Sequence, residues 1–424
     1  MPERIPLALI GCGGMGRRHL RGLARLAASS HAGVDLVAVC DLNQANAELL
    51  ADEANDLVGH RPRVYSDIGQ MARAEVDLQA ASITTDAGSH HRVAVACLEA
   101  GLHLLCEKPL ALTVRGCTAI IDAAGRTGRL VSVAENYRRD PINRLARALI
   151  ADGAIGTPRL MIETNIGGGD RIAITPWRHM KHTGTITVDA GIHYADILRY
   201  YLGEVRRVFG ETRLHEKVRR NTSSAGPGGF YARWSSDFPE QIEPTGEDAL
   251  YAQLTFESGA VGHWIDDHAG HGLPTRQRLV FGSLGSLDCP GDRNGRPLRL
   301  ALDEGTQLAD EHILELAPSY HLDPLAAELF GGERVWTYSL EFNDTDGRLL
   351  ALEYDELARC ICAGVQPEVT GEEGRADLAL TYAAFESGLL GRPVTLDEVV
   401  RGHADAYQRD IDVQQGLLPE AVAR

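Results

Sequence analysis

The stretch Ile5-Pro6-Leu7-Ala8-Leu9-Ile10-Gly11-Cys12-Gly13-Gly14-Met15-Gly16 decides the fold of this chain. Its first six residues form a short apolar run, which is typical of a strand buried inside a parallel sheet. The glycines that follow match G-x-G-x-x-G, and residues 17–28 have the apolar spacing of a helix. A second apolar run, 36–40, ends at Asp41. Strand, glycine turn, helix, strand and acid in this order predict a dinucleotide-binding βαβ unit.

Each part of the motif has a physical reason. Gly11 permits the tight turn out of the strand, Gly13 lets a pyrophosphate approach the backbone, and Gly16 lets the helix pack on the sheet. The N-terminus of the helix then presents free N–H groups to the phosphates. A carboxylate at Asp41 can bind the ribose hydroxyls and repels a 2′-phosphate, so we expect NAD rather than NADP. The residues predicted to bind the cofactor here are Gly11, Gly13, Gly14, Met15, Gly16 and Asp41.

The alternation of strands and helices continues to about residue 135. Apolar runs at 78–83, 103–106 and 130–134 indicate further strands, and 91–100 and 113–124 have the pattern of helices, the second with Thr113 as its N-cap. Such alternation predicts a parallel sheet, which binds ligands beyond the carboxyl ends of its strands. The polar residues expected at those ends are Thr84, Thr85, Glu107, Lys108 and Asn136.

The composition narrows the class of protein. The chain has 424 residues and a formal net charge of −17, which works against binding nucleic acid or an anionic membrane. No window approaches ~18 uninterrupted apolar residues, and the N-terminus lacks the pattern of a signal peptide. Eight scattered cysteines, most of them in apolar runs, fit a reducing cytosol better than a disulfide framework. We therefore expect a cytoplasmic enzyme of two or three domains.

Four segments together carry a resemblance to a known family. They are 11–16 with Asp41, 85–90, Ala100-Gly101-Leu102-His103-Leu104-Leu105-Cys106-Glu107-Lys108-Pro109, and Asp189-Ala190-Gly191-Ile192-His193-Tyr194-Ala195-Asp196. The chain resembles the glucose–fructose oxidoreductase / inositol dehydrogenase family, also called Gfo/Idh/MocA. The resemblance implies an α/β protein with a Rossmann domain, 1–135, followed by an α/β domain, 136–424, on a large, open, mostly antiparallel sheet. That second domain would bind the substrate and form a homo-dimer or homo-tetramer.

The resemblance also implies an oxidoreductase that acts on a secondary hydroxyl of a sugar, cyclitol or glycoside. Lys108, Asp189 and His193 match the family's catalytic groups. A histidine suits the removal of a hydroxyl proton near neutral pH, and a lysine ammonium can stabilise a developing alkoxide. Asp189 and His193 are four residues apart, so on one helical turn the carboxylate would orient the imidazole. We expect Lys108, Tyr137, Asp189 and His193 to bind the substrate. The further residues expected at the cofactor are Thr84, Thr85, His90, Glu107, Lys108, Asn136, Trp177 and Arg178.

Several alternatives stay open at this stage. The enzyme could use NAD transiently, as a glycosidase or dehydratase that passes through a keto-sugar, or the chain could be a non-catalytic NAD-binding regulator. The cluster His263, Asp266, Asp267, His268 and His271 could hold a metal, but the reaction needs none and we predict none. Two segments, 215–248 and 318–336, look like insertions that could serve as lids, oligomer arms or walls of the site.

Overall fold

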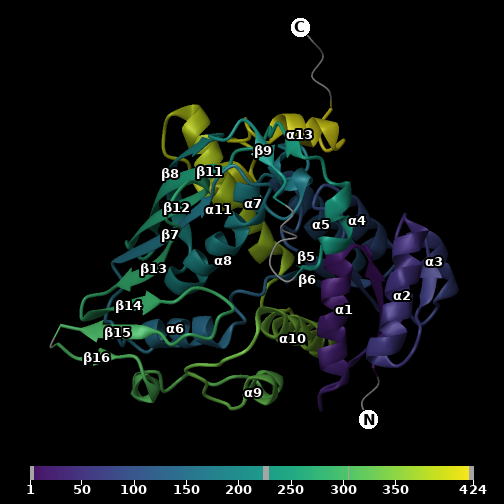
Figure 1. Ribbon diagram of the computed structural model, residues 1–424, viewed down its shortest axis with the longest axis horizontal. Coiled ribbons are helices and arrows are strands. Elements are labelled where there is room, and N and C mark those ends of the chain that lie inside the picture. The colour runs from purple at the N-terminus through teal and green to yellow at the C-terminus, as the bar shows by residue number, and fades with distance from the viewer. Residues whose placement is uncertain (1–3, 223–228, 304, 420–424) are drawn as a thin grey trace, which may run out of the picture.

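The fold is built on two large sheets that lie side by side (Figure 1). The computed structural model describes residues 4–222, 229–303 and 305–419. The first sheet has six strands in the order β3-β2-β1-β4-β5-β6, and the second has eight in the order β16-β15-β14-β13-β7-β12-β11-β8. Among the described residues, no helix is long and apolar enough to cross a membrane.

The first sheet is parallel throughout, as predicted for a Rossmann fold. Its strands are β1 (Ile5–Ile10), β2 (Val34–Cys40), β3 (Arg63–Tyr65), β4 (Ala80–Ile83), β5 (His103–Glu107) and β6 (Val131–Ala134). Its helices are α1 (Gly14–Ala27), α2 (Gln44–Val58), α3 (Ile68–Ala74), α4 (His90–Glu99) and α5 (Val114–Thr127). The N-cap predicted at Thr113 is confirmed, because its hydroxyl accepts a 3.1 Å hydrogen bond from the N–H of Gly116. The sequence did not predict β3, a three-residue edge strand without a fully buried side chain.

The second sheet is mixed, and only its β7–β12 pair is parallel. Its strands are β7 (Leu160–Gly168), β8 (Val205–Arg213), β11 (Ala249–Phe256), β12 (Val261–Gly270), β13 (Thr275–Phe281), β14 (Gly285–Cys289), β15 (Arg299–Leu302) and β16 (Gln307–Leu308). The large, open, mostly antiparallel sheet expected from the resemblance is therefore present. The remaining short elements are η1 (Pro176–His179), α7 (Ile186–Asp189), β9 (Arg219–Arg220), η3 (Ala232–Asp237), β10 (Gln241–Ile242), η4 (Glu311–Leu316), α9 (Pro324–Phe330), α12 (Leu396–Val400) and α13 (Arg409–Gln414).

The two faces of this second sheet differ in burial. Helices α6 (Pro141–Ala151), α8 (Gly191–Leu202) and α11 (Gly371–Leu390) pack on one face. A row of apolar side chains beneath them, in neighbouring strands, is fully buried: Val208, Leu254, Met161 and Val280. The adjacent row points the other way and stays accessible, since Phe209 is 47% exposed and Gln253 and His263 beside it are exposed. The sheet therefore has one covered face and one open face.

The chain returns to the first sheet near its end. Helix α10 (Phe342–Ala363) crosses α1 so closely that a Cβ placed on Gly22 would lie 2.6 Å from the Cβ of Leu350. Arg18 forms an ion pair with Asp346 across this crossing. The division at residue 135 stays a prediction, and part of the later chain completes the layer of helices around the first sheet. The insertion 318–336 lies beside α10 and contains α9 (Figure 1).

Candidate active site

The glycine turn after β1 is shaped for a close backbone approach. A Cβ on Gly16 would lie 2.2 Å from the carbonyl oxygen of Gly11, so only glycine lets α1 start against the strand. Gly11 has a φ of +96°, a conformation that favours glycine. At Gly13, in contrast, no heavy atom lies within 4 Å of an added Cβ, so the space beside this backbone is open. The turn therefore fits the pyrophosphate of a dinucleotide.

Asp41, the residue predicted to bind the ribose, is held in place beside the glycine turn. The Asp41 carboxylate accepts hydrogen bonds from the N–H groups of Cys12 at 2.6 Å and Asn43 at 2.8 Å. The contact with Cys12 places the carboxylate of Asp41 next to the first N–H of the glycine turn. Two other predicted cofactor residues also lie at this turn. Met15 is in the first turn of α1, and the hydroxyl of Thr84 donates to the carbonyl of Gly11 at 2.6 Å.

Asn136 and His90, two further residues predicted to bind the cofactor, differ in whether their polar atoms already face a partner. Asn136 is buried, and its side-chain oxygen has no partner among the described residues, so it can accept a hydrogen bond from a ligand. The ring nitrogens of His90 lie 2.9 Å from the carbonyl oxygen of Pro109 and 3.1 Å from that of Thr85. Both ring nitrogens of His90 therefore face backbone carbonyls in the loops after β4 and β5, and a contact of His90 with the cofactor stays a prediction.

Lys108, directly after β5, meets Asp189, the last residue of α7, although the two are 81 positions apart in the sequence. The ammonium of Lys108 donates to the backbone carbonyl of Asp189 at 2.8 Å and to its carboxylate at 3.2 Å. Arg178, which stacks on the ring of Trp177, donates to the other carboxylate oxygen at 2.7 Å. Burial alone would raise the pKa of Asp189, but Arg178 and Lys108 outweigh it and hold that pKa below its usual range. Asp189 is therefore an anion that positions two cations.

Buried side chains also hold the backbone of Lys108 in place. Glu107 is buried, and one of its oxygens accepts the N–H of Lys108 at 3.0 Å. The other oxygen lies 2.9 Å from Nε2 of His19, whose Nδ1 lies 2.7 Å from the hydroxyl of Tyr354 in α10. Glu107 therefore positions Lys108 through the backbone N–H of that lysine.

His193 has a different partner from the one we predicted. Asp189 ends α7 and His193 lies in α8, and the imidazole Nδ1 lies 2.8 Å from both carboxylate oxygens of Glu135 instead. The expected orientation of His193 by Asp189 is therefore wrong, because Asp189 is engaged by Lys108 and Arg178. Tyr137 stacks on the imidazole, with ring centroids 4.1 Å apart and planes inclined by 5°.

Burial changes the proton affinities of this Glu135–His193 pair. It raises the pKa of Glu135 to about 7, an effect opposed by the N–H of Tyr137 and by Lys108. Burial, together with the charges of Lys108 and Arg293, lowers the pKa of His193 well below its ordinary value. The imidazole is therefore neutral near pH 7, and its Nε2, which has no partner among the described residues, can accept a proton when Nδ1 donates to Glu135.

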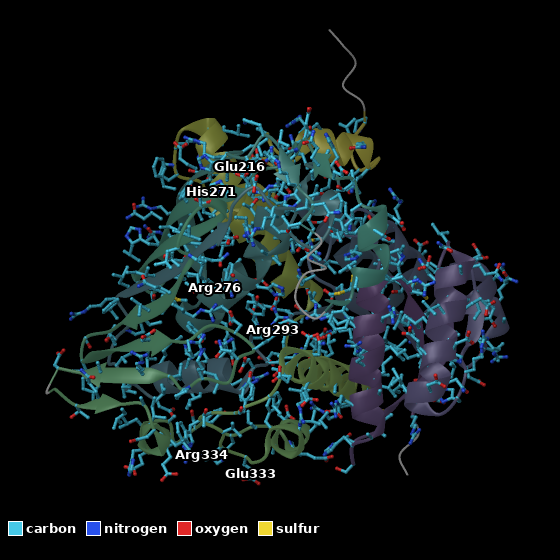
Figure 2. All side chains as sticks on the ribbon, viewed as in Figure 1. Glu216, His271, Arg276, Arg293, Glu333 and Arg334 are labelled. Atoms are coloured by element: carbon cyan, nitrogen blue, oxygen red, sulfur yellow. The ribbon has the colours of Figure 1, made fainter. Side chains whose placement is uncertain are left out.

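Sequence reasoning missed Glu135 and Arg293 as site residues. Arg293 has a φ of +56°, which is rare for a residue with a side chain. Its guanidinium carbon lies 5.0 Å from the centroid of the Tyr137 ring and it pairs with Asp346 at 3.0 Å, so it lies between the second sheet and α10 (Figure 2). Glu135 directly follows β6, and that position at a strand end was the available signal. Arg293 lies in a loop without a recognisable pattern.

The histidines and aspartates considered as a metal site do not all lie on one face of the second sheet. In β12, Asp266 is fully buried on the covered face, whereas His263 is exposed on the open face. His268 pairs with Asp266 at 3.1 Å, and His271 pairs with Glu216 at 2.9 Å (Figure 2). No three His, Cys, Asp or Glu side chains in the described part of the chain are grouped to hold a metal ion.

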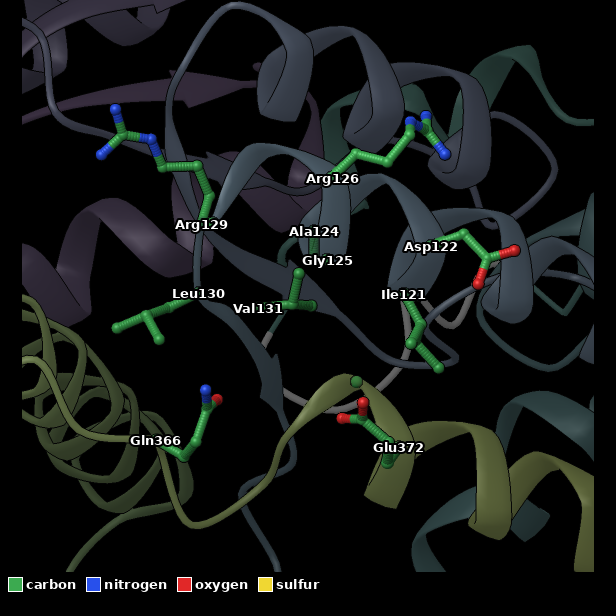
Figure 3. A pocket seen from close by; sticks show the side chains of 12 residues that line it. Ile121, Asp122, Ala124, Gly125, Arg126, Arg129, Leu130, Val131, Gln366 and Glu372 are labelled. Carbon is green, nitrogen blue, oxygen red and sulfur yellow. The ribbon is translucent and has the colours of Figure 1, made fainter.

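A hollow of about 810 Å³ lies elsewhere, between α5, β6 and the start of α11 (Figure 3). Arg126 and Arg129 border it on one side, and Gln366 and Glu372 on the other. None of the residues predicted for cofactor or substrate lines it.

The parallel sheet, the glycine turn and the polar groups at its strand ends define an NAD-binding oxidoreductase. Residues 5–135 match the NAD-binding Rossmann fold of the Gfo/Idh/MocA oxidoreductase family, and residues 143–288 match the C-terminal domain of the same family. The chain belongs to this Gfo/Idh/MocA family.

Individual relatives agree with this assignment. The chain is 28% identical to a D-apiose dehydrogenase of Paraburkholderia graminis, over 93% of this chain and 90% of that protein. It is 30% identical to inositol 2-dehydrogenase 2 of Saccharopolyspora erythraea, over 66% of this chain and 72% of the relative. The crystal structure of an NAD binding oxidoreductase from Klebsiella pneumoniae has the same fold, with a TM-score of 0.73 and 23% identity over 93% of this chain and 99% of the other.

Proposed function

We propose that this enzyme transfers a hydride between a secondary hydroxyl of a sugar, cyclitol or glycoside and NAD. The observation that carries the proposal is the meeting of the Lys108 ammonium, the Asp189 carboxylate and the Glu135–His193 pair where the strands of the first sheet end. The similarity to apiose and inositol dehydrogenases supports a polyhydroxylated substrate.

Side chains of the protein can bind the substrate hydroxyl and remove its proton. When bound, NAD supplies the hydride acceptor. Lys108 uses two donor contacts on Asp189, so its remaining N–H can bind the substrate oxygen and stabilise negative charge as the O–H bond breaks. His193 removes that proton through Nε2, and Asp189 keeps the lysine in place.

Glu135 completes the base. When ionised, it accepts the Nδ1–H of His193, which fixes the tautomer whose Nε2 carries a free lone pair. When Glu135 is protonated, it donates to Nδ1, and the ring proton must then stand on Nε2, where it blocks proton acceptance. Because the pKa of Glu135 is raised to about 7, we expect alcohol oxidation to accelerate as the pH rises through neutrality.

The test is turnover with purified protein, NAD or NADP, and a panel of sugars, inositols and glycosides, followed by the absorbance of the reduced nicotinamide. Oxidation with NAD that is lost in Lys108→Ala and His193→Ala supports the proposal. Release of a leaving group without net NADH would replace it with transient use of NAD. Full activity of both variants would refute the catalytic assignment.

We propose further that the enzyme works in the cytoplasm as a homo-dimer or homo-tetramer. All eight cysteines are unpaired thiols, as suits a reducing compartment. The open face of the second sheet exposes Phe209 and Phe281, at 47% and 37%, together with partly exposed Ile162 and Ile265. An uncovered sheet face that exposes apolar side chains in this way is suited to burial against a second copy. Light scattering at the mass of one chain, at micromolar concentration, would contradict the oligomer.

A further inference from the structure

An arm from the second sheet reaches the glycine turn of the first. Its base is the β9–β10 pair, in which Arg219 lies opposite Ile242. Arg219 is fully buried and fastens this base to the second sheet by binding Asp248 at 3.1 Å and the carbonyl of His268 at 3.2 Å. Beyond the base, residues 229–237 lie at the N-terminal end of α1, where η3 is found (Figure 1). The arm thus starts on one sheet and ends on the other.

The end of the arm packs on one face of α1. The ring of Phe230, which is 8% exposed, lies 4.7 Å from the guanidinium carbon of Arg21 and 5.9 Å from that of Arg18. Two ring atoms of Tyr231 lie 2.9 Å from the position of a Cβ on Gly14. Positions 14, 18 and 21 follow the spacing of one helical face, so the arm runs along α1 from its first turn.

The side chain of Tyr231 also interacts with that of Arg178. Its ring centroid lies 5.7 Å from the guanidinium carbon of Arg178, and it interacts electrostatically with Asp189 and Glu107. Arg178 is 6% exposed, yet its Nη1 has no partner among the described residues. A buried cationic donor without an acceptor is costly, which points to a ligand atom that completes it.

We propose that Tyr231 is a further cofactor-binding residue, which holds the diphosphate of NAD together with Arg178 and the first turn of α1. The N-terminus of α1 already favours an anion through its free N–H groups and its dipole. The phenol hydroxyl of Tyr231 and Nη1 of Arg178 add two donors to these N–H groups. Burial raises the pKa of Tyr231, so its hydroxyl keeps the proton that it donates. The inference rests on the NAD-linked function proposed above.

Binding measurements test this without catalysis. We would titrate wild type, Tyr231→Phe and Tyr231→Ala with NADH, ADP-ribose and adenosine by calorimetry. Because a hydrogen bond to a charged group is lost, we expect the Kd for NADH and for ADP-ribose to rise about tenfold in Tyr231→Phe and at least as much in Tyr231→Ala. Adenosine lacks both phosphates, and its Kd should stay the same. Tyr251→Phe is the matched control, because that hydroxyl binds Asp267 on the second sheet.

Other outcomes overturn the inference. Unchanged or tighter binding of NADH by both variants would show that Tyr231 does not hold the cofactor, while leaving the proposed function intact. An equal loss for adenosine would place the effect away from the diphosphate. If wild type binds neither NADH nor ADP-ribose, the inference and the proposed function both fail.

A second measurement checks the position of the ring. Gly14→Ala would push a methyl group into Tyr231. It should therefore weaken NADH binding more in wild type than in the Tyr231→Ala background. Equal effects in the two backgrounds would show that the ring does not lie on Gly14, and would overturn the inference.

Discussion

Replacement of Glu135 by glutamine should separate the activity of this enzyme from its stability. The side chain of Glu135 is 2% exposed, and burial raises its pKa from 4.5 to about 7. Such a shift corresponds to about 3 kcal/mol of free energy that the folded protein spends on keeping this carboxylate ionised. Glutamine has a similar shape and carries no charge.

The sign of the effect on stability follows from the two pKa values. Between pH 4.5 and about 7 the folded chain binds more protons at this position than the unfolded chain, so its stability falls as the pH rises through that window. Above pH 7 the full cost is present, and Glu135→Gln should raise the free energy of unfolding by up to about 3 kcal/mol. Below pH 4.5 both forms of the wild type are protonated, and the variant should gain little. Urea unfolding at pH 8 and pH 4.5 measures this difference.

The same substitution should reduce catalysis. An amide NH₂ can donate to Nδ1 of His193, which moves the ring proton to Nε2 and removes the base. We expect kcat for alcohol oxidation to fall by about 10²–10⁴-fold, the usual contribution of general base catalysis, and the loss of activity below about pH 7 to disappear from the pH profile. The Kd for NADH, measured by fluorescence, should change little.

Glu386→Gln is the matched control. Glu386 is buried in α11, burial raises its pKa to about 7, and it accepts the N–H of Tyr407 away from the cleft. Its replacement should affect stability but leave the pH profile unchanged. If Glu135→Gln keeps the kcat and the pH profile of wild type, the assignment of Glu135 as the partner that positions His193 is refuted.

Three further substitutions test other parts of the structure. Lys108→Met removes the donor expected at the substrate oxygen and should lower kcat by about 10²–10³-fold; an unchanged kcat would refute this role. Asp41→Ser removes the carboxylate that repels a 2′-phosphate, and the ratio of kcat/KM for NAD over NADP should fall by about tenfold or more, whereas an unchanged ratio would place the ribose elsewhere. Gly22→Ala puts a methyl group 2.6 Å from the Cβ of Leu350 and should cost about 1–3 kcal/mol in urea unfolding, and an unchanged midpoint would argue against the tight crossing of α1 and α10.

Local patterns in the sequence were sufficient to predict five of the six strands of the first sheet. Its strands are buried runs that end at glycine or polar residues, and the turn after β1 has a steric requirement that is visible in the spacing of Gly11, Gly13 and Gly16. The signal failed at β3, which is short and lies at the edge of the sheet. The second sheet was expected only through the resemblance, because the pairing of distant strands leaves no local mark.

The candidate site shows the same limit. Residues at the ends of strands could be assigned to the candidate site from the sequence, but the residues that they contact could not be predicted. The sequence spacing favoured Asp189 as the partner of His193, whereas the structure supplies Glu135, 58 positions away. Contacts of this kind depend on how the two sheets meet, and so does the position of Tyr231 on Gly14.

The crossing of α1 by α10 has a consequence for how the chain is made. Arg18 and Asp346, which meet at this crossing, are separated by 328 positions in the sequence. At a synthesis rate of about 5–20 residues per second, the ribosome needs roughly 16–66 s to make the segment between them. Once β6 has been made and the first sheet is complete, the growing chain carries a cofactor-binding fold whose helix α1 still lacks its contact with α10. The order of translation therefore leaves the surface of α1 around Gly22 uncovered until α10 is synthesised.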